Sequence, residues 1–129
     1  MSETSEERHV PVLIALYAAY TLFSVTGLLV LKNFMPLARA AVSSGHLISG
    51  DTLGAAAGAG SYILSFLIWL VILSRVPVSR AYPVAIGLTL AFTAIGSRVV
   101  LGENLALPHV LGILTVFVGI LLISIPAPG

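Results

Sequence analysis

Four long apolar stretches constrain this chain more than any other feature of its sequence. They cover residues 10–31, 52–73, 81–101 and 107–125. Each has about the 20 apolar residues that an α-helix needs to cross the hydrocarbon core of a bilayer. Because only helices and closed barrels satisfy their backbone hydrogen bonds inside lipid, the pattern predicts an all-α membrane protein built as a bundle of four transmembrane helices.

Composition supports a membrane protein of one domain, residues 1–129. The chain is 58% hydrophobic and 9% charged, whereas soluble domains carry about 25% charged residues. The absence of cysteine excludes disulfides, thiolate metal sites and cysteine nucleophiles. A net charge of +1, without a basic patch, gives no indication of nucleic-acid binding. Residues 1–9 are acidic, unlike the start of a cleaved signal peptide, so we expect the first apolar stretch to stay as a membrane anchor.

The connections between the stretches differ in length. Residues 102–106 are few enough to force the third and fourth helices into an antiparallel hairpin. The first connection, residues 33–51, is long and leaves two alternatives open. Its apolar part forms either a short amphipathic helix in the membrane interface or a loop that rests on the bundle. Asp51 or Thr52 is predicted to be the N-cap of the second helix.

Basic residues give no clear orientation in the membrane. Three lie on the side that holds the N-terminus, and two lie on the other side, or three if Arg98 snorkels outward. The two sets are Arg8, Arg75 and Arg80, and Lys32, Arg39 and Arg98. Because the basic residues of the loops set membrane orientation, a balanced chain can insert both ways, which permits an antiparallel homodimer.

Polar side chains recur at helical spacing in the first and third helices. The stripes are Tyr17, Thr21 and Ser24, and Tyr82, Thr89 and Thr93. Positions three, four or seven apart share a helix face. Two interpretations remain open: the stripes face a common, partly hydrated substrate cavity, or their hydroxyls bond to their own backbone carbonyls and hold helices together.

The fourth helix carries a seam of small residues, Gly112, Thr115 and Gly119. Small residues let membrane helices approach closely, so the seam predicts a helix–helix contact. The spacing does not decide whether this contact lies within one chain or between two.

Two charged residues lie near the end of the third helix. Arg98 is the only charge inside a predicted span. It is either functional or anchored at the boundary, where it pairs with Glu103. Glu103 is either a solvated turn residue or a weak candidate for coupling to transport. The three histidines lack the spacing of metal ligands, and no catalytic constellation is present. We therefore expect no enzyme activity, no cofactor and no metal site.

Several motifs of the second half resemble the small multidrug resistance family of the drug/metabolite transporter superfamily. They are Pro77, Ala81–Tyr82, Gly87, Gly102–Glu103 and residues 112–123, with Lys32 and Tyr62 matching in the first half. The resemblance implies a four-helix protomer that dimerises through the glycine seam of the fourth helix. It also implies that Tyr82 lies near the substrate cavity.

The chain departs from the multidrug exporters of this family where their chemistry takes place. Those exporters carry a glutamate in the middle of the first helix, which binds proton and cationic drug, and Ser24 occupies that position here. Ala85 stands where the exporters have tryptophan, and Thr89 replaces a glycine. Without a buried carboxylate, we do not expect proton-coupled drug export.

Residues 76–78 and 81–83 are similar to a second, EamA-like branch of small flippase subunits. These subunits move aminoarabinose-linked undecaprenyl phosphate across the bacterial inner membrane. The resemblance implies a flippase, or a flippase subunit, that pairs with a second copy or a related small subunit. Basic residues would hold the lipid phosphate: Lys32, Arg39, Arg80 and Arg98. The polar stripes would pass the head group while the polyprenyl tail stays in lipid. A small multidrug or metabolite exporter and a non-transporting accessory subunit remain alternatives.

Overall fold

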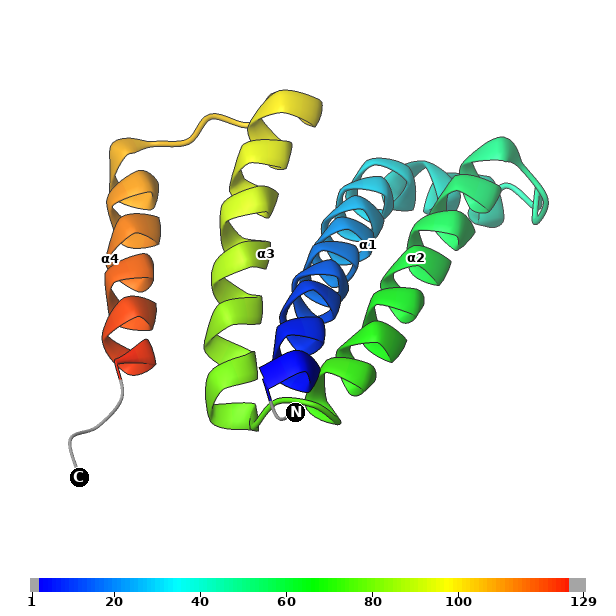
Figure 1. Ribbon diagram of the computed structural model, residues 1–129. Helices are drawn as coiled ribbons and strands as arrows, with labels where there is room; N and C mark the ends of the chain where they lie inside the picture. Colours follow the sequence, from blue (N-terminus) through cyan, green and yellow to red (C-terminus); the bar gives the residue numbers. More distant parts are fainter. Residues whose placement is uncertain (1–2, 126–129) are drawn as a thin grey trace.

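Four α-helices make up the computed structural model, which describes residues 3–125 (Figure 1). They are α1 (Glu3–Ser43), α2 (Gly50–Leu73), α3 (Val78–Val100) and α4 (Leu107–Ser124). No strand occurs among the described residues, and all four helices are long and apolar enough to cross a membrane. The predicted all-α fold with four membrane-spanning helices is therefore confirmed.

The first helix is much longer than the sequence pattern predicts. At 41 residues and about 1.5 Å per residue, α1 measures roughly 60 Å, twice the hydrocarbon thickness of a bilayer. Most of the predicted first connection is thus helical, and the loop alternative is wrong. The cyan end of α1 leaves the line of its blue part (Figure 1). Pro36 lies inside the helix, where its ring crowds the carbonyl four residues earlier and bends the axis near Lys32.

The second helix starts two residues earlier than expected because Ser49 caps it. The Ser49 hydroxyl accepts a hydrogen bond from the backbone N–H of Thr52 at 3.2 Å. The prediction of Asp51 or Thr52 as the N-cap is therefore wrong. Serine caps a helix as well as aspartate does, and Asp51 instead lies in the first turn, where its charge suits the helix dipole.

Glycines bring α1 and α2 into backbone contact. A Cβ added at Gly27 would lie 2.8 Å from the carbonyl oxygen of Gly58 and 2.8 Å from the backbone nitrogen of Tyr62. The Ser61 hydroxyl reinforces the contact by donating to the Phe23 carbonyl of α1 at 3.0 Å. In lipid there is no hydrophobic force between helices, so such close backbone packing and interhelical hydrogen bonds stabilise the pair.

The fourth helix lies at the edge of the bundle. In the described chain α4 comes close to α3 and to neither α1 nor α2 (Figure 1). The contact depends on Gly87 of α3, where a Cβ would lie 2.6 Å from Cδ1 of Ile120. No residue of α4 is buried. The predicted antiparallel hairpin of α3 and α4 is confirmed, and it leaves most of the α4 surface uncovered.

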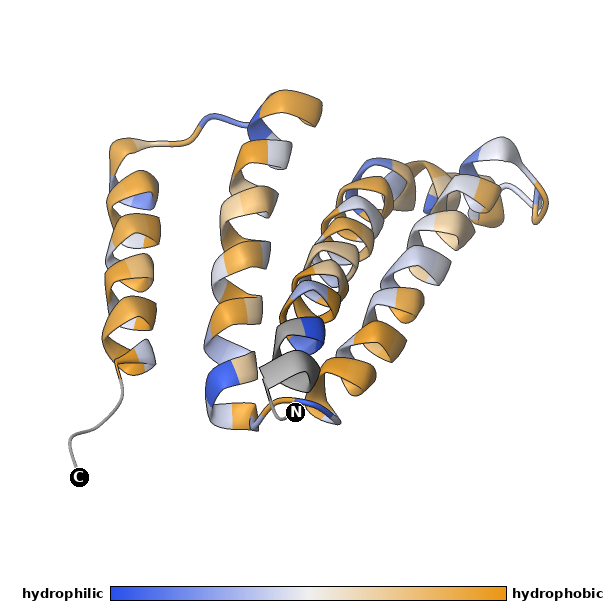
Figure 2. Cartoon of the chain, viewed as in Figure 1, coloured by the Kyte–Doolittle hydropathy of each residue, from blue (hydrophilic) through white to orange (hydrophobic). Residues whose placement is uncertain are grey.

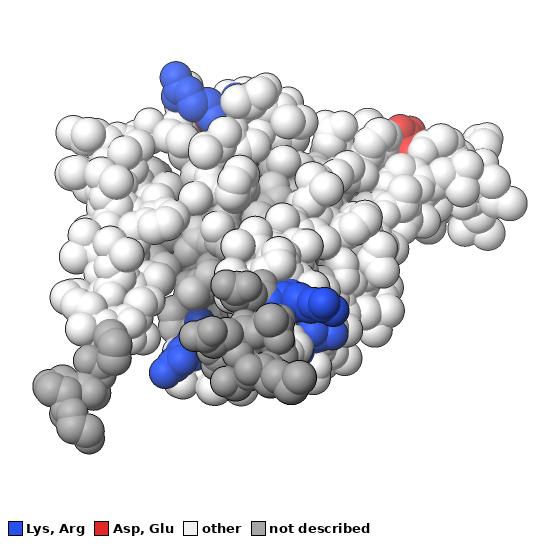
Figure 3. All heavy atoms as spheres, in the orientation of Figure 1, with Lys and Arg blue, Asp and Glu red and all other residues white. Residues whose placement is uncertain are grey.

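Apolar and charged residues lie in different parts of the molecule, with an uncharged band in the middle and charged residues at both ends. The helices are apolar along their lengths (Figure 2). Lysine and arginine side chains gather at the two ends of the helices and leave an uncharged band between them (Figure 3). This distribution matches a bilayer, whose hydrocarbon core excludes charge and whose interfaces accept it.

Candidate functional site

A cavity of about 790 Å³ lies between α1 and α3. From α1 it is lined by Ile14, Tyr17, Ala18, Thr21, Leu22, Val25 and Thr26. From α3 it is lined by Val84, Leu88, Phe92, Ile95, Gly96, Val99 and Val100. The two helices run side by side in the same direction (Figure 1), so the lining extends along their length. The cavity has the size of a small-molecule or lipid site, but its walls are almost entirely hydrocarbon.

Two of the six residues of the predicted polar stripes reach this cavity. Tyr17 and Thr21 belong to its lining. The other four, which are Ser24, Tyr82, Thr89 and Thr93, are not among the lining residues. Ser24 is buried, whereas Tyr82 is 55% exposed. The cavity is therefore far less polar than a head-group path, and the substrate-binding role of the stripes stays a prediction.

Several hydroxyls of the helices bond to their own backbone. Thr89 donates to the carbonyl of Ala85 at 2.9 Å, and Thr115 donates to that of Leu111 at 2.8 Å. Such bonds to the preceding turn are the usual solution for threonine in an apolar helix. Thr21 differs: it is only 6% exposed, and its hydroxyl has no hydrogen-bond partner among the described residues.

An aromatic cluster joins three helices near the α2–α3 connection. The ring centroid of Trp69 on α2 lies 5.5 Å from that of Tyr20 on α1 and 6.1 Å from that of Tyr82 on α3. Both pairs are tilted, a geometry that stabilises aromatic contacts beyond simple burial. Spacing within one helix could not reveal Tyr20 and Trp69 as partners of Tyr82, because the cluster forms only when three helices meet.

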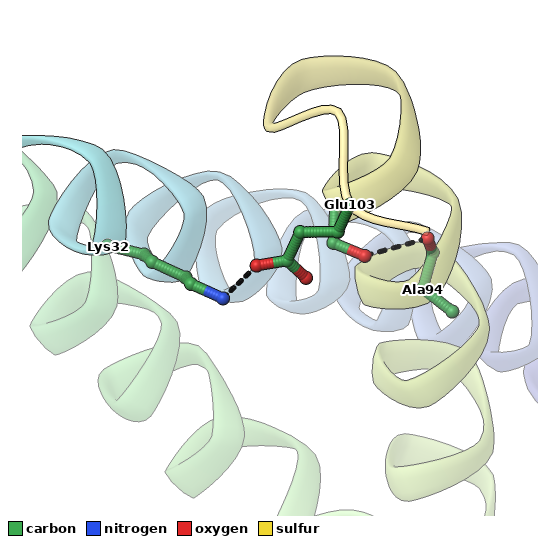
Figure 4. A network of polar contacts seen from close by, with 4 residues as sticks. Lys32, Ala94 and Glu103 are labelled. Atoms are coloured by element: carbon green, nitrogen blue, oxygen red, sulfur yellow. Dashed lines mark hydrogen bonds and ion pairs between the residues drawn. The ribbon is translucent and has the colours of Figure 1, made fainter. Parts of the chain in front are cut away.

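One ion pair lies at the membrane boundary near the end of α3. Lys32 on α1 pairs with Glu103, which follows α3 (Figure 4). The backbone N–H of Glu103 donates to the Ser97 carbonyl at 3.1 Å, and Gly102 allows this turn with a φ of +67°. The alternative in which Glu103 pairs with Arg98 is not observed in the described chain. Arg98 is exposed in the last turn of α3, where it suits the helix dipole.

Arg80 lies at the opposite boundary, beside a second cavity of about 520 Å³. This cavity is lined by the start of α3, including Ser79 and Arg80, and by the end of α4. Eighteen residues separate Arg80 from Arg98, which is roughly 27 Å along a helix. That separation is close to the thickness of the hydrocarbon core, so α3 carries a basic side chain at each boundary. Arg39 is exposed on the last turns of α1.

The glycine seam of α4 has no partner within the described chain. A Cβ added at Gly112 or at Gly119 would meet no atom within 4 Å, and Thr115 is exposed. Of the two alternatives for this seam, packing within one chain is therefore not observed. Contact between two chains stays a prediction.

Within the described residues, no three histidine, aspartate or glutamate side chains come together as a metal site would require. The candidate site thus consists of an apolar cavity between α1 and α3, with basic side chains at both membrane boundaries. None of the basic side chains lines the α1–α3 cavity itself, and their role in binding stays a prediction.

One curated relative shares this chain's sequence over about half its length. It is the probable 4-amino-4-deoxy-L-arabinose-phosphoundecaprenol flippase subunit ArnE of Enterobacter sp. (strain 638). The two sequences are 41% identical over 60 residues, which cover 46% of this chain and 55% of the relative. This chain is similar to a small flippase subunit. The resemblance to small transporters of the drug/metabolite type is thereby confirmed.

The similarity is local. The matched segment spans about half of the relative's length, no family model matches the chain, and no solved structure matches it. The relative is named as a transport subunit, not as an enzyme. Together with the four apolar helices, the relationship identifies a multi-pass protein of the inner membrane.

Proposed function

We propose that this chain is a flippase, or a flippase subunit, for a polyprenyl-phosphate-linked sugar or a similar anionic lipid. The observation that carries the proposal is the 41% identity to a flippase subunit over 60 residues. The chain has four membrane-spanning helices that are apolar in the middle and charged at their ends. This arrangement is compatible with moving a lipid between leaflets.

The positions of the basic residues support an anionic cargo. Arg80 marks one boundary, and Arg98 and Lys32 mark the other, so a lipid phosphate meets a cation on either side of the membrane. Hydrogen bonds between a charged donor and a phosphate are about twice as strong as neutral ones. Lys32 already pairs with Glu103. A phosphate that binds Lys32 therefore competes with the Glu103 carboxylate for the donors of the ammonium group.

The uncovered surface of α4 supports assembly with a second subunit. Both seam glycines are open, and no residue of α4 is buried. The partner is a second copy of this chain or a related small subunit, and α4 is the helix that would meet it. The relative's own name calls it a subunit.

Transport in proteoliposomes tests the proposal. The protein, alone and with a co-expressed candidate partner, is reconstituted with a fluorescent polyprenyl-phosphate sugar, and access of a membrane-impermeant quencher reports movement between leaflets. We expect the protein to accelerate exchange. Arg80→Gln and Arg98→Gln should each slow it at least about 10-fold, because a lost charge-assisted bond costs roughly 1.5–3 kcal/mol. Arg75→Gln is the matched control for Arg80→Gln, because Arg75 lies in the α2–α3 connection at the same boundary and, unlike Arg80, lines neither cavity. Unaccelerated exchange in every combination would refute the proposal.

A non-transporting accessory subunit is the second candidate, and the exposed α4 favours it. Substitution at the aromatic cluster separates the two functions. Tyr82 is half-exposed, so Tyr82→Ala should leave the fold intact. If Tyr82→Ala abolishes transport while the complex persists, the chain takes part in transport itself. If transport is unchanged and only substitutions in the α4 seam disrupt the complex, the chain is an accessory subunit.

A further inference from the structure

The end of α1 and the start of α2 form a helical hairpin at the side of the bundle. We call residues 33–53 the α1–α2 tip. Residues 33–43 add roughly 16 Å of helix beyond Lys32. Phe34 packs closely on α2, because a Cβ added at Gly54 would lie 2.7 Å from the Cδ1 atom of Phe34. Ala38 is buried. The tip is therefore a packed element of the fold.

The apex of the tip is held in place by a turn on one side and a helix cap on the other. Gly45 ends α1 with a φ of +84°, a conformation that favours glycine. The backbone N–H of His46 donates to the Ala41 carbonyl at 2.9 Å, and Ser49 caps α2. The two residues between these contacts, 47 and 48, therefore have a defined place at the apex.

Large apolar side chains cover the outside of the tip. Leu47 and Ile48 are 68% and 87% exposed, and Ile48 is the most exposed large apolar residue that the structure describes. Four more such side chains are 44–62% exposed: Met35, Leu37, Val42 and Leu53. Exposing this much hydrocarbon to water is unfavourable, and an apolar patch of this kind marks a contact with lipid or with another protein.

The position of the tip favours lipid. In Figure 1, α3 and α4 stand upright, whereas α1 and α2 lean away from them. The tip consequently lies to the side of the bundle and no higher than the α3–α4 connection (Figure 1). Glu103 in that connection pairs with Lys32 at the membrane boundary. The tip thus lies at the depth of the headgroups, where the surrounding bilayer is next to its apolar side chains.

The charges of the tip leave hydrophobic contact as the force that would attach it. Arg39 and Asp51 carry opposite charges, so they contribute no net charge. The long side chain of Arg39 can reach the headgroups while its methylene groups stay in apolar surroundings. Attachment should therefore not require anionic lipid.

We propose that the α1–α2 tip is an interfacial anchor, in which Leu47 and Ile48 insert into the hydrocarbon of the adjacent leaflet. The backbone of the turn stays among the headgroups, because its unpaired polar groups need water. The anchor keeps α1 and α2 in their leaning orientation and prevents the excess length of α1 from projecting into water. It is independent of the proposed function, since it concerns bilayer lipid and not the cargo.

Spin labels test the depth of the apex. The chain has no cysteine, so Ile48→Cys and the matched control Ser44→Cys each carry one nitroxide, in vesicles of phosphatidylcholine. Oxygen enters lipid, whereas a polar nickel complex, supplied on both sides of the membrane, does not. We expect the ratio of oxygen to nickel collisions to be at least about 3-fold higher for Ile48→Cys, because an interfacial apolar face lies about 5–10 Å deep. Adding phosphatidylglycerol should not change this ratio.

Three results would overturn the anchor. If the nickel complex reaches both labels equally, the apex lies in water, even where a co-expressed partner later shields it. If neither reagent reaches the label of Ile48→Cys, the apex is buried against protein. A ratio that rises only with phosphatidylglycerol would indicate headgroup binding in place of insertion.

A second substitution tests whether Leu47 inserts together with Ile48. In the labelled Ile48→Cys protein, Leu47→Asp should lower the collision ratio to that of Ser44→Cys, because a charge is costly in hydrocarbon. Leu47→Val should keep the ratio. Both variants should fold, since Leu47 is largely exposed. An unchanged ratio in Leu47→Asp would refute insertion of the apex.

Discussion

Replacing Gly27 with alanine should destabilise the bundle, because the new methyl group has no room. Its Cβ would lie 2.8 Å from two backbone atoms of α2. Backbone atoms cannot rotate away as side chains can, so α1 and α2 must separate by several tenths of an ångström. Overpacking of this kind costs about 1–3 kcal/mol, and separation also strains the bond from Ser61 to the Phe23 carbonyl.

The matched control is Gly60→Ala. A Cβ at Gly60 meets no atom within 4 Å. Both substitutions gain about 0.5–1 kcal/mol of helix propensity, and this gain cancels in the comparison. The free energy of unfolding should therefore be lower for Gly27→Ala than for Gly60→Ala by about 1–3 kcal/mol.

Fluorescence of Trp69 provides the assay. Trp69 is the single tryptophan of the chain, and its ring lies 5.5 Å from Tyr20 on α1. Titration of the protein in mixed micelles with sodium dodecyl sulfate separates α1 from α2 and changes this contact. If the two variants unfold at the same denaturant fraction, α1 and α2 do not cross at Gly27 and the packing argument fails.

Three further predictions concern charge, assembly and orientation. A double-mutant cycle on Lys32→Ala and Glu103→Ala should give a coupling free energy of about 0–1 kcal/mol that falls with added salt. The reason is that the side chains of Lys32 and Glu103 are 60% and 39% exposed. A larger coupling that does not depend on salt would show that the pair is buried in the membrane. Gly119→Leu should abolish chemical cross-linking between subunits without changing the unfolding midpoint, since a Cβ at Gly119 would meet no atom of the described chain within 4 Å. Cross-linking at the level of the unaltered protein would exclude α4 as the contact. Cysteines introduced at Ser44 and Ser74 should each react with an impermeant maleimide from both sides of the membrane, given the balanced basic residues; labelling of each from one side alone would exclude dual insertion.

The helical fold was predictable from the sequence because hydropathy and backbone hydrogen bonding act locally. Each of the four apolar stretches must be helical wherever it sits in lipid, and the short α3–α4 connection permits only an antiparallel hairpin. The extension of α1 through residues 33–43 was not predictable from hydropathy. The segment is mostly apolar but is interrupted by Asn33 and Arg39, and Pro36 is ordinarily a sign that a helix ends.

The candidate site was predictable only in part. Tyr17 and Thr21, which spacing places on one face of α1, both line the cavity between α1 and α3, and their role in substrate binding stays a prediction. Spacing within one helix could not show which helix lies opposite. For that reason it did not predict the hydrocarbon wall from Val84 to Val100, or the pairing of Lys32 with Glu103.

The sequence by itself determined the class of this protein: four membrane-spanning helices, charges confined to their ends, and motifs shared with small flippase subunits. Only the tertiary structure decided which surfaces meet. It packs α1 against α2 through Gly27, opens an apolar slot between α1 and α3, and leaves α4 uncovered. The physical reason is that hydropathy sorts residues between lipid and water. Contacts between helices in lipid depend instead on the close fit of particular side chains, which no single helix specifies alone.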